Sequence, residues 1–187
     1  MLDADSKAQL KSYLALLKQP IELVSTLDDS AKAKEMQGLL QDIAGLSDKI
    51  TLRDDPHASV RKPSFAINRV GTNIGVRFAA IPMGHEFTSL VLALLHVGGH
   101  TIKLDAGTIE QTKALSGDYD FEIYMSLTCQ NCPDVVQTLN QFALLNPAIS
   151  NEMIDGGLFQ EQIEAKNIQG VPAVYLNGEP FATGKID

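Results

Sequence analysis

Hydrophobic and polar positions along the chain follow two periods, and the period changes repeatedly. Leu10, Tyr13, Leu14 and Leu17 recur at helical spacing after a candidate N-cap at Asp5 or Ser6. Alternating stretches between polar turns predict strands. The expected elements of the first half, in chain order, are a helix closed by Gln19-Pro20, a strand over 21–26, a helix over 31–46, strands over 50–52, 64–68 and 76–79, and a helix over 85–97.

The same order then begins again. The strand expected over 121–127 follows the strand near 21–27 by 100 positions, and the next helix keeps that offset. Lys62-Pro63 pairs with Val171-Pro172 after a gain of nine residues, which fall in a helix-like stretch over 159–167. The pattern indicates an α/β protein of two tandem units around a mixed sheet.

We expect a first unit over 1–100, a connecting segment with a helix around 109–115 over 101–120, and a second unit over 121–187. The second unit lacks a counterpart of the helix over 85–97. The chain is therefore expected to be a fragment, truncated before the last helix of that unit.

Composition narrows the class of protein. The 187 residues carry 15 Lys and Arg against 23 Asp and Glu, a net charge of −8, which argues against a nucleic-acid ligand. The N-terminus lacks the features of a signal peptide, and the longest apolar stretch, 90–95, is far shorter than the ~20 residues of a membrane span. We expect a cytoplasmic protein that does not enter a membrane.

The two cysteines form the sharpest motif, Cys129-Gln130-Asn131-Cys132-Pro133, directly after an expected strand and at the start of an expected helix. The N–H groups and dipole of a helix N-terminus stabilise a thiolate. We place Cys129 at the edge of the helix and Cys132 one turn inside it, so that Cys129 attacks a partner and Cys132 resolves the mixed disulfide.

Two plainer interpretations compete with redox exchange. A zinc site needs two further ligands, and the four histidines show neither paired spacing nor a second Cys-x-x-Cys. A static structural disulfide is disfavoured in a reducing cytoplasm.

Gly170-Val171-Pro172 precedes an apolar strand over 173–176, about forty residues after the cysteines. A strand, a Cys-x-x-Cys-Pro and a Val-Pro before a hairpin together resemble the thioredoxin and glutaredoxin superfamily. That resemblance implies that Pro172 is cis and faces the disulfide. The internal repeat extends the expectation of a cis bond to Lys62-Pro63.

The phrases Arg61-Lys62-Pro63-Ser64-Phe65 and Gly84-His85-Glu86-Phe87, with a Cys-x-Asn-Cys-Pro in the second unit alone, narrow the resemblance. They resemble the N-terminal domain of the alkyl hydroperoxide reductase flavoprotein over the whole chain. Gln130 departs from the histidine that is often found there.

This resemblance implies a disulfide oxidoreductase that passes electrons from an FAD- and NADH-dependent module of the same, homodimeric protein to a peroxiredoxin, the second component of that reductase. The fragment itself contains no Gly-x-Gly-x-x-Gly after a strand, so we expect no cofactor in it. The alternatives are a free-standing double-thioredoxin oxidoreductase or isomerase, and a thioredoxin-like adaptor without redox function.

Three residues outside the cysteine motif remain to be placed. Asp29 and Lys32 stand at the positions of the cysteines in the first unit, which should therefore be redox-inactive, complete the sheet and wall the active site. Glu86 begins a helix, where an acid suits the dipole. The resemblance implies instead that Glu86 lies near the cysteines and exchanges a proton with them.

Overall fold

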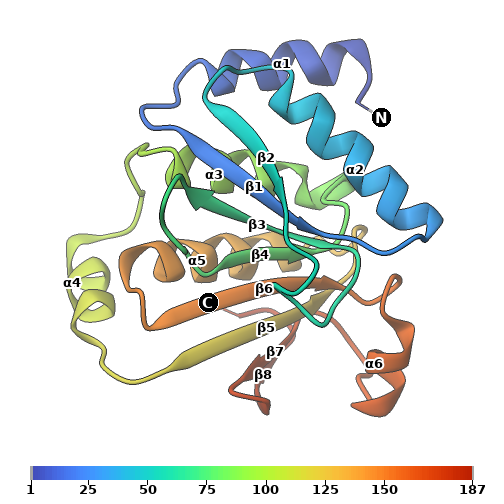
Figure 1. Ribbon diagram of the computed structural model, residues 1–187. Helices are drawn as coiled ribbons and strands as arrows, with labels where there is room; N and C mark the ends of the chain where they lie inside the picture. Colours follow the sequence, from blue (N-terminus) through green and yellow to red (C-terminus); the bar gives the residue numbers. More distant parts are fainter. Residues whose placement is uncertain (1, 187) are drawn as a thin grey trace.

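A single sheet organises the computed structural model, which describes residues 2–186 and contains eight strands in that range (Figure 1). Their order is β2-β1-β3-β4-β6-β5-β7-β8. The strands are β1 (Ile21–Thr26), β2 (Ile50–Asp54), β3 (Ser64–Arg69), β4 (Val76–Ala79), β5 (Tyr119–Met125), β6 (Ile149–Asp155), β7 (Ala173–Leu176) and β8 (Glu179–Thr183).

The sheet repeats itself. β1 pairs in parallel with β2 and antiparallel with β3, which pairs antiparallel with β4. In the same senses, β5 pairs in parallel with β6 and antiparallel with β7, which pairs antiparallel with β8. The first unit is thus β2-β1-β3-β4 and the second β6-β5-β7-β8, and a parallel ladder from Val76 opposite Asn151 to Ala79 opposite Ile154 joins them. The predicted internal repeat and the shared mixed sheet are confirmed.

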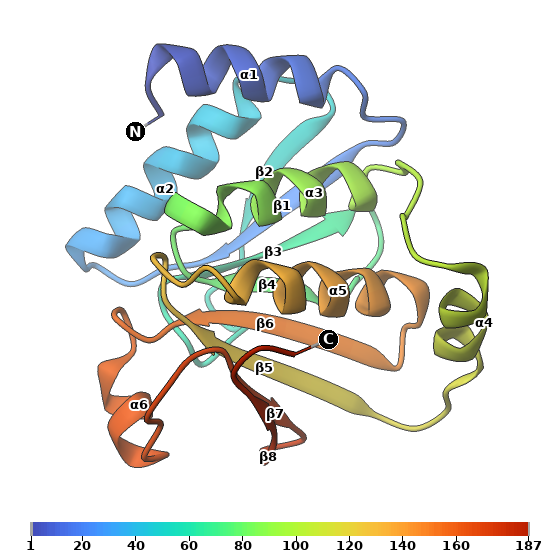
Figure 2. The ribbon, with the colours of Figure 1, turned by 180° about the vertical axis from the view of Figure 1, so that it is seen from behind.

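The helices are placed unequally on the two faces of the sheet. α1, α2, α3 and α5 cover one face (Figure 2), and α6 lies on the other, against a small apolar cluster around Tyr124 and Tyr175. The helical elements are α1 (Ala4–Leu14), α2 (Ala31–Ala44), the 3-10 turn η1 (Gly84–Glu86), α3 (Phe87–Val97), α4 (Ala106–Ala114), α5 (Cys132–Leu145) and α6 (Gln160–Ala165). The first unit has no helix between β2 and β3, where the second has α6, as the nine-residue gain predicts.

Some expected boundaries are wrong. α1 is capped by Asp3, whose carboxylate accepts the N–H of Ser6 at 2.7 Å, so the cap is neither Asp5 nor Ser6. α4 begins at Ala106 because Asp105 caps it in the same way through Thr108. The helix expected from 85 starts as a 3-10 turn and becomes α-helical only at Phe87.

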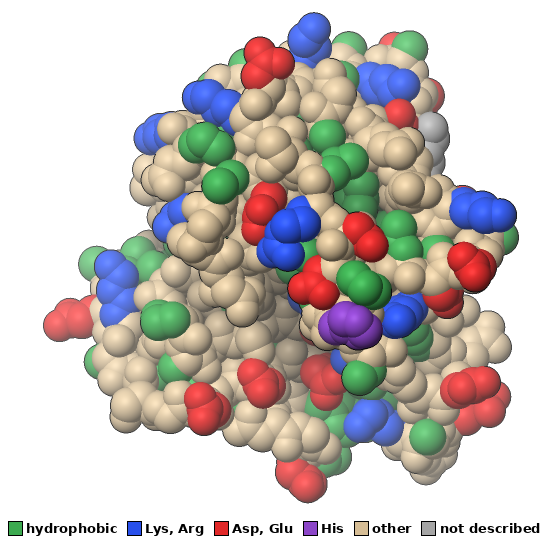
Figure 3. Space-filling model, viewed as in Figure 1, with side chains coloured by type: hydrophobic (Ala, Val, Ile, Leu, Met, Phe, Trp, Pro, Cys, Tyr) green, Lys and Arg blue, Asp and Glu red, His purple; other side chains and the backbone are tan. Residues whose placement is uncertain are grey.

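Arg61 links the two units on the face that carries α6, where charges of both signs gather (Figure 3). It comes from the loop between β2 and β3 of the first unit and forms ion pairs with Glu122 on β5 and Glu152 on β6. Its Nε also donates to Gln162 of α6 at 2.9 Å. Burial alone would lower the pKa of Arg61, but the charges of Glu152 and Glu122 outweigh burial and raise it. The half-buried network therefore ties the two units together as one body.

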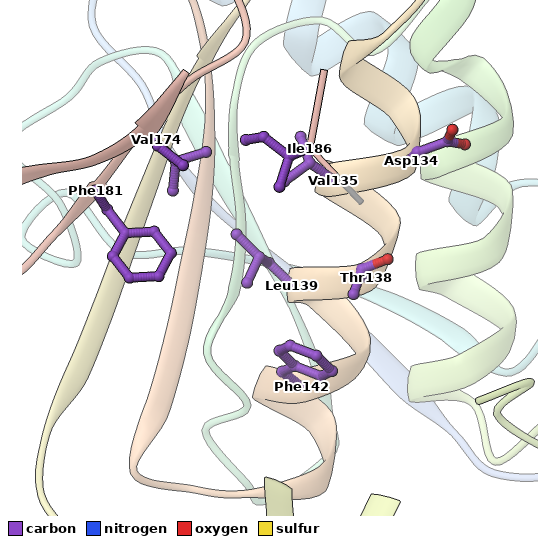
Figure 4. A pocket seen from close by; sticks show the side chains of 9 residues that line it. Asp134, Val135, Thr138, Leu139, Phe142, Val174, Phe181 and Ile186 are labelled. Carbon is purple, nitrogen blue, oxygen red and sulfur yellow. The ribbon is translucent and has the colours of Figure 1, made fainter. Parts of the chain in front are cut away.

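An apolar groove of about 400 Å³ lies beside α5 (Figure 4). Leu139 and Phe142 of α5 form one side, and Val174, Phe181 and Ile186 form the other. In the first unit, α3 follows β4 and packs against β3 and α5. β7 and β8 of the second unit correspond to β3 and β4 of the first. The groove lies beside β7, in the place that α3 occupies beside β3.

Candidate functional site

The cysteine pair lies between β5 and α5 in the second unit. Cys129 and Cys132 form a disulfide with their Cα atoms 5.5 Å apart, within the usual range. Cys132 is fully buried, whereas Cys129 is half-buried. The expectation that Cys129 is the more exposed sulfur is therefore confirmed.

The start of the helix differs from the expectation. α5 begins at Cys132, with Asn131 as its cap, so Cys129 lies in the preceding loop and Cys132 is not one turn inside the helix. β5 ends at Met125, and a turn in which the N–H of Cys129 donates to the carbonyl of Ser126 at 3.0 Å takes up the intervening residues. Pro133 fits the first turn, where a missing N–H leaves no hydrogen bond unmade. The first N–H groups of a helix have no partner within it, and α5 begins only three residues after Cys129.

Both predicted proline bonds, Lys62-Pro63 and Val171-Pro172, are cis. The Sγ of Cys129 lies 3.8 Å from the carbonyl oxygen of Val171. The Val171-Pro172 bond therefore lies next to the disulfide, as the resemblance implies, and the loop before β7 forms one side of the site.

Glu86 is fully buried at the end of η1, which packs against α5. Burial raises its pKa to about 6, against the opposing effect of a hydrogen bond from Ser89. Glu86 is the N-cap residue of α3, but its side chain accepts no helix N–H. The carboxylate therefore lies at the first turn of α3, where it accepts the hydroxyl of Ser89 in place of a helix N–H.

The first unit forms a wall of the redox site. The N–H of His85 donates to the carbonyl oxygen of Leu127 at 3.1 Å, two residues before Cys129. Gly84 has a φ of +57°, and a Cβ there would lie 2.8 Å from the same oxygen, so only glycine allows this approach. η1 is thereby held against the loop that carries the disulfide.

The equivalent place in the first unit has no sulfur. Asp29 and Lys32 are exposed, and Lys32 pairs with Glu35 at 3.1 Å. Ser30 caps α2 by accepting the N–H of Ala33, and Asp28 accepts both the N–H and the hydroxyl of Ser30. These contacts begin a helix and leave no group that exchanges disulfides.

Two absences bear on the alternatives. Among residues 2–186 there is no group of three or more His, Cys, Asp or Glu side chains placed to hold a metal ion. Within the same range, no helix is long and apolar enough to cross a membrane.

Two residues of the site escaped the sequence analysis. Ser89 donates its hydroxyl to Glu86 at 2.6 Å, and Gln137 of α5 donates its amide to Ser89 at 3.1 Å. The first contact joins residues three apart at a helix start, a spacing at which side chains lie side by side, so the sequence offers a signal for it. The second joins residues 48 apart, and no local pattern predicts it.

The fold and the site define a class: two fused thioredoxin-like units, of which the second carries a redox-active Cys-x-x-Cys disulfide. A thioredoxin domain model matches residues 119–187. The N-terminal domain of the alkyl hydroperoxide reductase AhpF from Enterococcus faecalis superposes with a TM-score of 0.91 at 33% identity, covering 100% of this chain and 96% of that one. The chain belongs to the family of these N-terminal domains.

Curated relatives extend the likeness over the full chain. The F subunit of alkyl hydroperoxide reductase from Pseudomonas aeruginosa is 61% identical, and a Bacillus subtilis protein named NADH dehydrogenase is 50% identical. Each match covers 100% of this chain and 36% of the relative. The chain thus spans about a third of the length of these relatives.

Proposed function

We propose that this chain is the electron relay of an NADH-dependent peroxide-reducing system, taking two electrons from a dithiol of a flavoprotein module and passing them to the disulfide of a peroxiredoxin. The observation that carries the proposal is a single disulfide whose half-buried sulfur lies beside the Val171-Pro172 bond, in a chain of this family. Disulfide exchange needs such an accessible sulfur with a second thiol nearby.

In the forward step, the Cys129 thiolate attacks one sulfur of the partner disulfide, forms a mixed disulfide and releases the other partner sulfur as a thiolate. The N–H groups at the start of α5 stabilise the attacking thiolate. Cys132 then loses its proton and attacks the Sγ of Cys129. This second attack restores the Cys129–Cys132 disulfide and leaves the partner as a dithiol, two electrons richer.

Glu86 and Pro172 have supporting roles in this proposal. The Glu86 carboxylate accepts the proton of Cys132 before the second attack, which its pKa of about 6 suits at neutral pH. Pro172 shapes the loop that holds the Val171 carbonyl against Cys129. We also propose that Gln130, the exposed residue after Cys129, affects the reactivity of the Cys129 thiolate.

The source of the electrons lies outside this chain. The relatives are almost three times as long, and one of them is named NADH dehydrogenase, which supports a following module that binds FAD and NADH. We place the relay in the cytoplasm, within a homodimeric full-length protein.

Reconstitution tests the proposal. The chain, a thioredoxin-reductase-like flavoprotein, NADH and the peroxiredoxin are mixed, and NADH oxidation on peroxide addition is followed with wild type and Cys129→Ser. Wild type should support turnover and Cys129→Ser none; equal turnover would overturn the relay. Cys132→Ser should trap a mixed disulfide with the peroxiredoxin.

Insulin as the disulfide substrate separates the alternatives. If the chain reduced insulin as fast as it reduced the peroxiredoxin, a general disulfide oxidoreductase or isomerase would be favoured. Reduction of neither substrate would favour an adaptor.

A further inference from the structure

A chain of hydrogen bonds joins three elements beside the disulfide loop. Oε1 of Glu86 accepts the hydroxyl of Ser89 at 2.6 Å, and the Oγ of Ser89 accepts the amide of Gln137 at 3.1 Å. Glu86 belongs to η1, Ser89 to the first turn of α3, and Gln137 to α5, five residues after Cys132. Figure 2 shows α3 and α5 side by side on the helical face.

The chain of bonds has a direction. The amide nitrogen of Gln137 can only donate, so it occupies a lone pair of the Ser89 oxygen. The one hydroxyl proton of Ser89 is then directed to Oε1 of Glu86. Because Glu86 and Ser89 are both fully buried, no solvent competes for these groups.

The two oxygens of the carboxylate are therefore unequal. Oε1 has its donor, whereas Oε2 is buried without a hydrogen-bond partner among the described residues. A buried carboxylate oxygen without a donor is costly, and a catalytic role is one explanation for such a group. Oε2 is the atom that remains open to a proton.

We propose that Ser89 and Gln137 are positioning residues of the redox site, which hold Glu86 through Oε1 so that Oε2 takes the proton of Cys132 during disulfide exchange. The inference rests on the proposed function, in which Glu86 is the base. The Cys132 S–H bond breaks, its proton forms an O–H bond at Oε2, and the sulfur keeps the electron pair with which it attacks Cys129.

Neighbouring charges do not set the pKa of Glu86. The titratable residues on the elements packed together here are His85 of η1, Cys132 and Asp134 of α5, and His96 at the far end of α3. His85 and Asp134 are exposed, and no charge contributes to the shifted pKa of Glu86. In the oxidised chain the cysteines do not titrate.

The first test follows the side-chain carboxyl carbon of Glu86 by ¹³C NMR during pH titration of the oxidised chain. Since the Ser89 hydrogen bond lowers the pKa of Glu86, Ser89→Ala should move the midpoint up by about one pH unit. Gln137→Leu frees the serine hydroxyl to rotate and should raise the midpoint by a smaller amount. Ser89→Thr, which keeps the hydroxyl, should restore the wild-type midpoint, and Thr88→Ala, an exposed neighbour on the same turn, should not move it.

The second test measures the resolving step with Ellman's reagent. Cys129 attacks the reagent and releases one thionitrobenzoate; attack by Cys132 releases the second, and the rate of that phase is recorded against pH. In Ser89→Ala its midpoint should rise by the shift seen in the titration. An unmoved midpoint in either experiment would overturn the positioning role.

Glu86→Gln separates this inference from the proposed function. If this variant resolves the mixed disulfide with the wild-type rate and pH profile, Glu86 is not the base and both ideas fail together. If it slows resolution about tenfold or more while Ser89→Ala and Gln137→Leu behave as wild type, the base stands and only the positioning role is wrong.

Discussion

Burial of Glu86 should make the oxidised protein less stable as the pH rises from about 4.5 through about 6. Its pKa rises from the ordinary 4.5 to about 6, chiefly because burial disfavours the charged form. The shift of 6 − 4.5 = 1.5 units corresponds to about 2 kcal/mol. Since the folded state holds this proton more tightly than the unfolded state, the contribution is fully present below pH 4.5 and is lost as the pH rises through about 6.

Glu86→Gln isolates this contribution. Glutamine keeps an oxygen that can accept the hydroxyl of Ser89, and it carries no charge at any pH. Its extra amide donor has a cost, but that cost is the same at low and at neutral pH and cancels in the difference between the two. Relative to wild type, the variant should gain about 2 kcal/mol between about pH 4 and pH 7.5.

Urea unfolding of both oxidised proteins at these two pH values measures the effect. For a chain of this length, 2 kcal/mol corresponds to about 4 to 8 °C in Tm, so thermal scans provide a second measurement. The reasoning would be refuted if the difference between variant and wild type did not change with pH, or if wild type gained on the variant as the pH rose. Either result would mean that the charge of Glu86 does not destabilise the folded state.

Three further expectations concern other parts of the molecule. Arg61→Met removes the ion-pair partner of Glu122 and one of the two partners of Glu152, which keeps Arg77, and should cost about 3 kcal/mol in urea unfolding. Arg53→Met, which breaks more exposed pairs with Glu22 and Asp55, should have far less effect; equal losses would contradict the linking role. Limiting iodoacetamide below neutral pH should label Cys129 of the reduced protein before Cys132, as mass spectrometry can show, and the opposite order would reverse their roles. Phe181→Ser should hardly change the stability of residues 1–187, where Phe181 is 60% exposed, but should destabilise a longer chain whose next helix fills the groove; equally small effects would refute such a helix.

The sequence predicted the fold well where a local pattern has only one structural meaning. β4 has the expected bounds, and the pairing of Lys62-Pro63 with Val171-Pro172 located both cis bonds. Boundaries failed where several neighbouring residues are chemically equivalent. Asp3, Asp5 and Ser6 can all cap a helix, and only the folded chain shows that the carboxylate of Asp3 reaches the N–H of Ser6.

The start of α5 was misplaced for a different reason. Parallel pairing of β5 with β6 runs from Tyr119 opposite Ile149 to Met125 opposite Asp155, so the strand ends two residues before the alternating pattern does. The turn that follows then carries Cys129 in front of the helix. Register between strands depends on contacts about thirty residues away, which hydrophobic periodicity alone does not record.

Glu86 shows where local inference stops. A glutamate before an apolar helix is accounted for by the helix dipole, and only Ser89, three residues on, gives a local hint of a further contact. Its surroundings depend on two distant contacts: Gly84 lets η1 approach Leu127, and Gln137 of α5 holds the Ser89 hydroxyl that Glu86 accepts. Both distant partners lie in the second unit, about 40 and 50 residues along the chain. The first unit thus lacks a disulfide of its own but contributes η1 to one side of the second unit's site. In the proposed function, the Glu86 carboxylate would give the fusion of the two units a chemical as well as a structural consequence.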